Sequence, residues 1–398
     1  MTLHRVAKVL LSCSSLHRRS SARRATLMLL MAMASGAGAQ VLPRLPAVGA
    51  NTALLTVSGL SSGGYMATQF AVAYSASVSG VAVLAGGPYG CSQGSVNTAS
   101  LNCSCPANPP WWLQVQQLWG GGCQTLAAQV YAERSLAAVR ANQGQIDPID
   151  NLARQRVWLF SGGQDKVVRA PLVQALQITY ERLGVPAAQI HHEKRGDAGH
   201  GFPSLAATES CSTTASPFIT QCQFDAAGEL LKWLHPDLAS ATPAAVDTGA
   251  FKRFDQSRYA QVGEFNSLDA TGWLYLPRAC EQAGAKCAVH VVFHGCEQGQ
   301  SFKVAGKEYG RQFVDSTGYN RWAEAGKIVV LYPQIKPNER GGLFDPYRYN
   351  PKGCWDFWGY TEKSAALNPG APNFAKKSAP QMRAVKGMVE DLMRGPEH

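Results

Sequence analysis

The chain has 398 residues, of which 45% are hydrophobic and 16% are charged, a composition typical of a globular protein with a sizeable core. The formal net charge of +10 is concentrated at the start, because residues 1–39 hold six of the 37 lysines and arginines and none of the 27 acids. The rest of the chain has a net charge of +4, evenly spread, which excludes a nucleic acid as a partner.

Residues 1–39 have the three parts of a secretory signal peptide. A basic segment comes first, an apolar run follows at residues 25–34, and small residues provide a cleavage site before Gln40. The apolar run is too short to cross a bilayer, so we expect no membrane span. The sequence therefore predicts that residues 40–398 are secreted, to the periplasm or the extracellular medium.

Residues 53–66, ALLTVSGLSSGGYM, form the motif that the later elements depend on. Residues 53–57 are β-prone, residues 65–71 are compatible with a helix, and a turn with the pattern G-x-S-x-G joins them. In such a nucleophile elbow the serine has a strained backbone, and the glycines let the helix pass close to the strand. We expect Ser61 to be a catalytic nucleophile.

Residues 81–85 predict a buried strand, and an irregular segment at residues 89–123 follows it. This segment has four cysteines, and we expect disulfides to hold it over one edge of the site. Its tryptophans belong either to a local core or to the substrate-facing side. They are Trp111, Trp112 and Trp119.

The two partners of a catalytic serine come next, in the order that an α/β-hydrolase uses, acid before histidine. Residues 156–160 predict a strand, and Asp165 follows it in a glycine-rich loop. Residues 172–183 predict a helix, and residues 190–193 predict a last strand that leads to His200 between two glycines. We expect Asp165 to orient His200, and His200 to act as the general base.

Neighbouring residues offer alternatives to this pair. Asp197 is a rival acid, although its place three residues before the histidine is more typical of a turn residue. His191 and His192 are adjacent on a predicted strand, so their side chains point to opposite faces and at most one of them can reach the site.

The strands that ordinarily precede the nucleophile come last in this chain. Residues 236–249 have the composition of a linker. Beyond it the pattern predicts strands at residues 272–277, 288–293 and 328–333 and a helix at residues 319–325. We therefore predict an α/β fold, a circularly permuted α/β-hydrolase with a mostly parallel sheet flanked by helices. In this single domain, residues 50–235 carry the nucleophile, acid and base, and residues 250–398 carry the oxyanion hole.

Ten cysteines remain after the signal peptide, and an even number in an exported chain favours disulfides over metal ligands. Cys211 with Cys222, and Cys280 with Cys287, are close enough in sequence to close small loops. The other pairings are left open by the sequence.

Six motifs in this order, GLSSGGYM, SGGQD, DAGHGFP, FHGCEQ, LYPQ and GCWDFWGY, resemble the secreted polyhydroxybutyrate (PHB) depolymerases with a circularly permuted catalytic domain, of the single-domain kind. The resemblance covers most of residues 50–395. Many bacterial members carry a polymer-binding domain after the catalytic part, whereas this chain ends at His398, so we expect weaker attack on crystalline polymer.

Carried onto matching positions, the resemblance implies the following roles. Ser61 is the nucleophile with Asp165 and His200 as its partners, the N–H groups of Ser62 and Cys296 form the oxyanion hole, Cys296 is bridged to Cys354, and Trp358 lies beside the substrate.

The segment GCWDFWGY, residues 353–360, has four aromatic residues among glycines, which is typical of a surface loop with an apolar wall. Trp358 is the first candidate for substrate contact and Trp355 the second. The alternative interpretation is that these aromatic residues pack in the core.

These observations predict a secreted, monomeric serine esterase that hydrolyses poly(3-hydroxybutyrate) or its oligomers through an acyl-enzyme, without a metal or organic cofactor. Its partner is then a polyester or oligoester substrate. Two alternatives remain: a secreted carbohydrate esterase that removes acetyl or feruloyl groups, and a catalytically silent polymer-binding protein.

Overall fold

The computed structural model describes residues 42–395 except for residues 52, 107–113, 116–117, 119–121, 283, 340–347 and 363–372. The predicted signal peptide and the tryptophans Trp111, Trp112 and Trp119 lie outside the described residues. The described residues form one compact unit.

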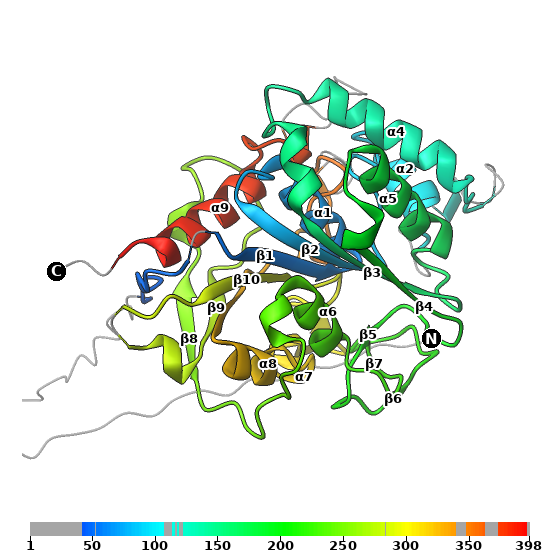
Figure 1. The fold of residues 1–398 in the computed structure, drawn as a ribbon. Helices are drawn as coiled ribbons and strands as arrows, with labels where there is room; N and C mark the ends of the chain where they lie inside the picture. The colour runs from blue at the N-terminus through cyan, green and yellow to red at the C-terminus, as the bar shows by residue number, and fades with distance from the viewer. Residues whose placement is uncertain are drawn as a thin grey trace, which may run out of the picture. The chain divides into compact units, whose positions relative to one another are not determined.

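An eight-stranded sheet is the centre of this unit (Figure 1). Its strands are β1 (Leu55–Leu60), β2 (Val78–Leu84), β3 (Arg156–Gly162), β4 (Ile190–Arg195), β8 (Ala250–Asp255), β9 (Thr271–Leu276), β10 (Ala288–Phe293) and β13 (Ile328–Tyr332). Their order is β4-β3-β2-β1-β10-β13-β9-β8. The six strands from β4 to β13 run parallel, and β9 is antiparallel to both of its neighbours.

The central strands are buried on both faces, as expected for parallel strands covered by helices. Every residue of β1, β10 and β13 is buried, and β13, with the sequence IVVLY, is a continuous apolar run. The edge strand β8, with the sequence AFKRFD, exposes its lysine and arginine. Charged residues of this kind protect an edge strand from pairing with another chain.

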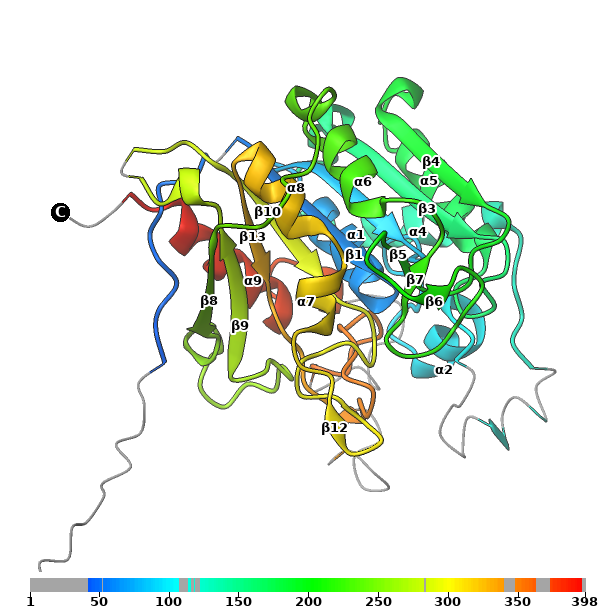
Figure 2. The ribbon, with the colours of Figure 1, turned by 90° about the horizontal axis from the view of Figure 1, so that it is seen from below.

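Two layers of helices cover the sheet (Figures 1 and 2). In the view of Figure 1, α1, α4, α5 and α9 lie above the sheet, whereas α6, α7 and α8 lie below it. The helices are α1 (Ser62–Ala73), α2 (Val96–Thr98), α4 (Ala128–Ala141), α5 (Ala170–Arg182), α6 (Ala226–Leu234), α7 (Gln312–Ser316), α8 (Tyr319–Gly326) and α9 (Pro380–Met393). Short strands β5 (Phe202–Pro203), β6 (Glu209–Ser210) and β7 (Ile219–Gln221) form a small second sheet, and β11 (Lys303–Val304) and β12 (Lys307–Glu308) form a hairpin.

The predicted permuted α/β fold is confirmed. Strands β1 to β4 come from the first part of the chain and form one half of the sheet, whereas β8, β9, β10 and β13 form the other half. The two halves meet where β1 pairs with β10 in parallel register, Leu55 opposite Val289. Residues 236–249 connect α6 to β8, and Ala244 exchanges hydrogen bonds with Arg321 on α8.

All ten cysteines after the predicted signal peptide are in disulfides. The two pairings expected from sequence proximity, Cys211–Cys222 and Cys280–Cys287, are confirmed. The other bridges are Cys91–Cys103, Cys105–Cys123 and Cys296–Cys354. Within the described part of the chain, no helix is both long enough and apolar enough to span a bilayer.

A chain of buried polar side chains lies against β1 on the side of α6 and α8. His290 on β10 contacts the hydroxyls of Thr56 at 2.7 Å and Ser58 at 2.8 Å, and Thr56 also contacts His235 at 2.9 Å. Burial lowers the pKa of His235 to about 4, against the opposing effect of Asp237. Burial, and then the neighbouring His235, lowers the pKa of His290 well below its usual value.

These histidines predict acid sensitivity. An unfolded histidine has a pKa of about 6.5, so between pH 6.5 and about 4 the unfolded state binds more protons than the folded state. The free energy of unfolding therefore falls as the pH falls through this window, by up to about 1.4 kcal/mol per pH unit for each such histidine. Chemical denaturation at a series of pH values measures this, and His235→Gln should give a shallower dependence than wild type. Parallel curves for the two proteins would contradict the prediction.

Candidate active site

The turn between β1 and α1 presents Ser61. Ser61 has φ 59° and ψ −121°, a backbone conformation that residues other than glycine rarely adopt. Its N–H donates to the Leu84 carbonyl at 2.9 Å. It is 9% exposed. The strained backbone is the feature expected of a nucleophile elbow, and the surrounding hydrogen bonds maintain it.

Two glycines make this turn possible. A Cβ on Gly59 would lie 2.2 Å from the Gly63 carbonyl oxygen, and a Cβ on Gly63 would lie 2.2 Å from the Phe293 carbonyl oxygen. Backbone oxygens cannot give way as a flexible side chain can. The absence of side chains at these positions therefore allows α1 to pass close to β1 and also to the end of β10.

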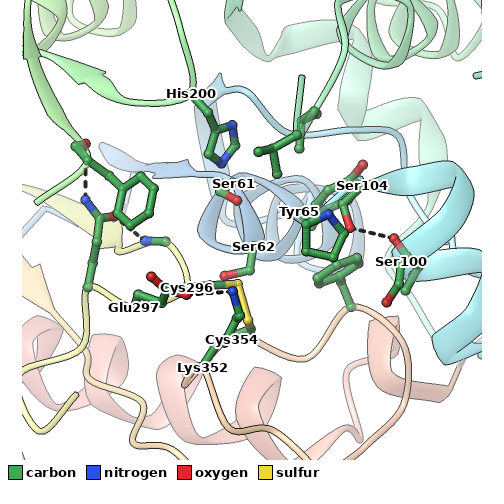
Figure 3. A pocket seen from close by; sticks show the side chains of 18 of the residues that line it. Ser61, Ser62, Tyr65, Ser100, Ser104, His200, Cys296, Glu297, Lys352 and Cys354 are labelled. Atoms are coloured by element: carbon green, nitrogen blue, oxygen red, sulfur yellow. Dashed lines mark hydrogen bonds and ion pairs between the residues drawn. A yellow bond between two sulfur atoms is a disulfide. The ribbon is translucent and has the colours of Figure 1, made fainter. Parts of the chain in front are cut away.

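His200 and Asp165 form a pair beside Ser61. His200 Nδ1 lies 2.7 Å from Asp165 Oδ2, and both side chains are buried. The other oxygen of Asp165 accepts the N–H groups of Val167 at 2.8 Å and Val168 at 2.9 Å. Both carboxylate oxygens are therefore occupied. The ring of His200 is directed toward Ser61 (Figure 3).

The loops that carry these two residues pack backbone against backbone. Gln164 N–H donates to the Ala198 carbonyl at 2.9 Å, and a Cβ on Gly162 would lie 2.4 Å from that same oxygen. Gly199 is equally confined, because a Cβ there would lie 2.4 Å from the Ser212 carbonyl oxygen. The glycines in both loops thus place acid and base together.

The alternative acid and base residues lie elsewhere. The side chain of Asp197 is 61% exposed and lies 3.5 Å from Arg195. His191 packs against Trp158 and Trp233, and His192 contacts Ser161 at 2.9 Å. None of these three residues is among the described residues that line the cavity beside Ser61.

Two backbone N–H groups next to Ser61 are suited to hold an oxyanion. Ser62 begins α1, where the first N–H groups of a helix have no partner within the helix. Cys296 follows β10 in the oxyanion loop, which we define as residues 294–298. Among the hydrogen bonds between described residues, none uses the N–H of Ser62 or Cys296. Both residues line the cavity.

The oxyanion loop is tied to a second loop in three ways. Cys296 is bridged to Cys354, the Glu297 N–H donates to the Lys352 carbonyl at 2.7 Å, and the two side chains form an ion pair at 2.7 Å. Glu297 itself has φ 66°. A covalent bridge and an ion pair on neighbouring residues therefore maintain this conformation.

The aromatic loop, residues 353–360, turns around the buried carboxylate of Asp356. One oxygen of Asp356 accepts the N–H groups of Trp358, Gly359 and Tyr360 at 2.6 to 3.1 Å, and the other accepts the N–H and hydroxyl of Thr361. Burial raises the pKa of Asp356, and these hydrogen bonds oppose the shift. The loop is thus an ordered turn.

The two tryptophans of this loop have different surroundings. Trp358 is half-buried and lines the cavity. The expectation that Trp355 contacts substrate is wrong in this structure, because Trp355 is fully buried and does not line the cavity. Its ring packs edge-on against Phe293 and beside His294, and its backbone N–H donates to Ser62 Oγ at 3.3 Å. Trp355 therefore packs against the end of β10 and the start of α1.

The cavity in front of Ser61 has a volume of about 390 Å³. Figure 3 shows it between Ser61, Cys296 and the serines Ser100 and Ser104. The segment expected to cover one edge of the site supplies a wall, made of Val96, Ala99, Ser100, Ser104 and Pro106. Tyr65 on α1 holds this wall, since its hydroxyl donates to the Cys103 carbonyl at 2.5 Å.

Sequence reasoning missed several residues of this cavity, among them Tyr65, Gln298 and Glu297. The Tyr65 hydroxyl and the Gln298 Nε2 each donate to a carbonyl more than 35 residues away in the chain. The only available signal was the run of polar residues in FHGCEQ directly after a buried strand.

A buried acid–histidine pair beside a serine on a strand–turn–helix elbow, with free N–H groups at a helix start, is the arrangement of a serine hydrolase. The comparisons agree with this class. The chain is 38% identical over 354 residues to a poly(3-hydroxybutyrate) depolymerase of Delftia acidovorans and covers 62% of that relative, so it spans about three-fifths of its length. It is 30% identical over 375 residues to a polyhydroxybutyrate depolymerase of Talaromyces funiculosus, with 91% of this chain and 96% of that one covered.

Solved structures give the same result. The crystal structure of PHB depolymerase from Penicillium funiculosum matches with a TM-score of 0.70 at 30% identity, covering 88% of this chain and 98% of that one. A PHB depolymerase complexed with R3HB trimer matches equally well. The chain matches no protein-family model. It belongs to the PHB depolymerase family, as the six motifs predicted.

The contact between His200 Nδ1 and Asp165 Oδ2 at 2.7 Å predicts that Asp165 is the acid that orients the histidine. Asp165→Asn should lower kcat on 4-nitrophenyl butyrate by about 10⁴-fold, because an amide favours the wrong imidazole tautomer. Ser61→Ala and His200→Ala should abolish turnover. Asp197→Asn is the matched control and should retain wild-type kcat. A crippled Asp197→Asn beside an active Asp165→Asn would show that the acid is misassigned.

Proposed function

We propose that this chain is a secreted serine esterase that hydrolyses poly(3-hydroxybutyrate) or its oligomers through Ser61, His200 and Asp165. The observation that carries the proposal is the His200–Asp165 contact at 2.7 Å beside a strained Ser61, at the bottom of a cavity. Relatives that are depolymerases by name, one of them complexed with R3HB trimer, support the choice of substrate.

The chemistry follows from the positions of the atoms. Asp165 accepts a hydrogen bond from the Nδ1–H of His200, so the lone pair of Nε2 is free to take the proton of Ser61. The serine oxygen attacks the ester carbonyl, and the N–H groups of Ser62 and Cys296 hold the oxyanion, each contributing roughly 3 kcal/mol to the barrier reduction. His200 returns the proton to the leaving alcohol. Water, activated by the same histidine, then releases the acyl group from Ser61.

The charge of the cavity fits a neutral substrate. Among the described residues that line it, Glu297 is the only acid and Lys352 the only lysine or arginine, and the two neutralise each other at 2.7 Å. A polyester has ester carbonyls and alkyl groups but no charge along its chain. It therefore requires apolar contact and a few hydrogen bonds rather than an ion pair.

Secretion is supported by the redox state of the chain. Five disulfides join all ten cysteines of residues 40–398. Such bridges form and persist in oxidising compartments. They agree with the predicted signal peptide at residues 1–39.

The substrate class is tested by comparing hydroxybutyrate esters with acetylated and feruloylated glycans as substrates. The protein should release 3-hydroxybutyrate or short oligomers from hydroxybutyrate trimers and from amorphous polymer, and it should act far more slowly on acetylated or feruloylated glycans. Product analysis by mass spectrometry measures both. Faster release of acetate or ferulate would favour a carbohydrate esterase, and failure of a serine-directed phosphonate to label Ser61 would favour a silent binding protein.

Trp358 gives a second prediction about the substrate. Its indole forms part of the cavity wall and packs edge-on against Phe357 at 5.0 Å. Trp358→Ala should reduce hydrolysis of hydroxybutyrate oligomers and amorphous polymer by about tenfold, because apolar contact with the indole contributes roughly 1 to 2 kcal/mol. Turnover of 4-nitrophenyl acetate should change little.

Trp233→Ala is the matched control for this change. Trp233 is also half-buried, but it lies on α6 under the guanidinium of Arg156 and does not line the cavity. It should lower the melting temperature without selecting between substrates. An equal loss on both esters in Trp358→Ala would mean that this tryptophan is structural.

A further inference from the structure

The peptide groups on both sides of Gly295 are held by side chains. The Gly295 N–H donates to Gln298 Oε1 at 2.8 Å. The Gly295 carbonyl accepts the backbone N–H of Gln298 at 3.3 Å and lies 2.7 Å from His294 Nδ1. Gly295 is the residue directly before Cys296, so these contacts act on the loop that carries a proposed oxyanion donor.

The tautomer of His294 follows from its two neighbours. The Ile335 N–H donates to His294 Nε2 at 3.1 Å, so Nε2 carries the lone pair and the proton is on Nδ1. Burial lowers the pKa of His294 to about 4 and keeps the ring neutral. His294 therefore donates a hydrogen bond to the Gly295 carbonyl.

Fixing this carbonyl also fixes the next N–H. A peptide bond is planar and trans, so the Cys296 N–H points opposite to the Gly295 carbonyl. The carbonyl points toward the buried ring of His294, and the N–H consequently points away from it. Cys296 itself lines the cavity.

Gln298 also reaches the segment that packs on the general base. Its Nε2 donates to the Pro217 carbonyl at 3.0 Å and to the Phe218 carbonyl at 3.3 Å. The ring of Phe218 lies edge-on to that of His200, with 6.4 Å between centroids. Gln298 is only 1% exposed, so water does not replace these hydrogen bonds if the amide is removed.

We propose that Gln298 is a positioning residue that sets the direction of the Cys296 N–H by holding the Gly295 backbone and by joining it to residues 217–218 beside His200. The proposal rests on the proposed hydrolysis through Ser61 and adds a residue to it. Gln298 does not touch the reacting atoms. It acts through the Cys296 N–H and through the segment that packs against His200.

Gln298→Met tests the proposal, with Gln300→Met as its matched control. Gln300 is a buried amide two residues further on, which accepts the indole N–H of Trp273 at 2.7 Å and donates to the Thr271 carbonyl at 2.7 Å. It is not among the described residues that line the cavity. Both substitutions remove an amide that bridges two segments, but only Gln298 belongs to the oxyanion loop and contacts the Gly295 backbone.

We expect Gln298→Met to lower kcat on 4-nitrophenyl butyrate by about 10- to 100-fold with little change in KM, since the misdirected donor is needed only in the transition state. Gln300→Met should keep kcat within about twofold of wild type, even where its melting temperature falls as far as that of Gln298→Met. An alkyl trifluoromethyl ketone, which forms an oxyanion on Ser61, should lose affinity for Gln298→Met by the same factor as kcat/KM.

Gln298→Glu keeps the shape of the side chain and serves if Gln298→Met does not fold. Its carboxylate still accepts the Gly295 N–H but donates to the Pro217 carbonyl only when protonated. The ratio of its kcat to that of wild type should therefore rise as the pH falls.

Equal losses of kcat in Gln298→Met and Gln300→Met, an unchanged affinity for the trifluoromethyl ketone, or a flat pH ratio for Gln298→Glu would each overturn the positioning role. These assays use a soluble ester. A wild-type protein that leaves hydroxybutyrate oligomers intact would overturn the proposed substrate without affecting them, and full activity of Ser61→Ala would overturn the proposed function itself.

Discussion

The structure depends on one close backbone contact, between Gly63 at the start of α1 and the carbonyl oxygens of Phe293 and His294 at the end of β10. This contact joins the two halves of the permuted chain at the place where chemistry is proposed. A side chain at Gly63 would push α1 away from β10 and so move Ser62 relative to Cys296. The pairing of β1 with β10 supports the same contact along the sheet.

The other parts of the site repeat this arrangement of confined backbone reinforced by a cross-link. The acid and base loops meet at Gly162 and Ala198, and the Cys211–Cys222 bridge braces the residues behind Gly199. The oxyanion loop is bridged to the loop of Cys354. The opposite wall is closed by Cys91–Cys103 and Cys105–Cys123. Loops of irregular sequence are thereby given the rigidity that an oriented catalytic group requires.

Sequence patterns predicted the strands and the proposed triad because both depend on local signals. A buried parallel strand is an apolar run, and β10 occupies the predicted residues 288–293 without any shift. Helices α4 and α9 were not predicted, since the residues that precede them, Ala127 and Ala379, provide no side-chain cap. The edge strand β8 was missed because its charged residues break the apolar pattern.

Side-chain direction within irregular loops was beyond sequence reasoning. Trp355 and Trp358 are three residues apart in one motif, and only the turn around the Asp356 carboxylate sends one into the core and the other to the cavity. Gln298 is similar, because its amide partners at Pro217 and Phe218 lie 81 and 80 residues earlier in the chain. Such contacts exist only after the two halves of the sheet have come together.

The permuted order also determines when the site is complete during synthesis. Ser61 leaves the ribosome 235 residues before Cys296, and the cysteine that bridges to Cys296 follows 58 residues later still. A nascent chain therefore carries Ser61, Asp165 and His200 long before it has Cys296, the second proposed oxyanion donor. Because such bridges form and persist in oxidising compartments, we expect the bridge from Cys296 to Cys354, and with it the proposed site, to be completed only after the proposed export of the chain.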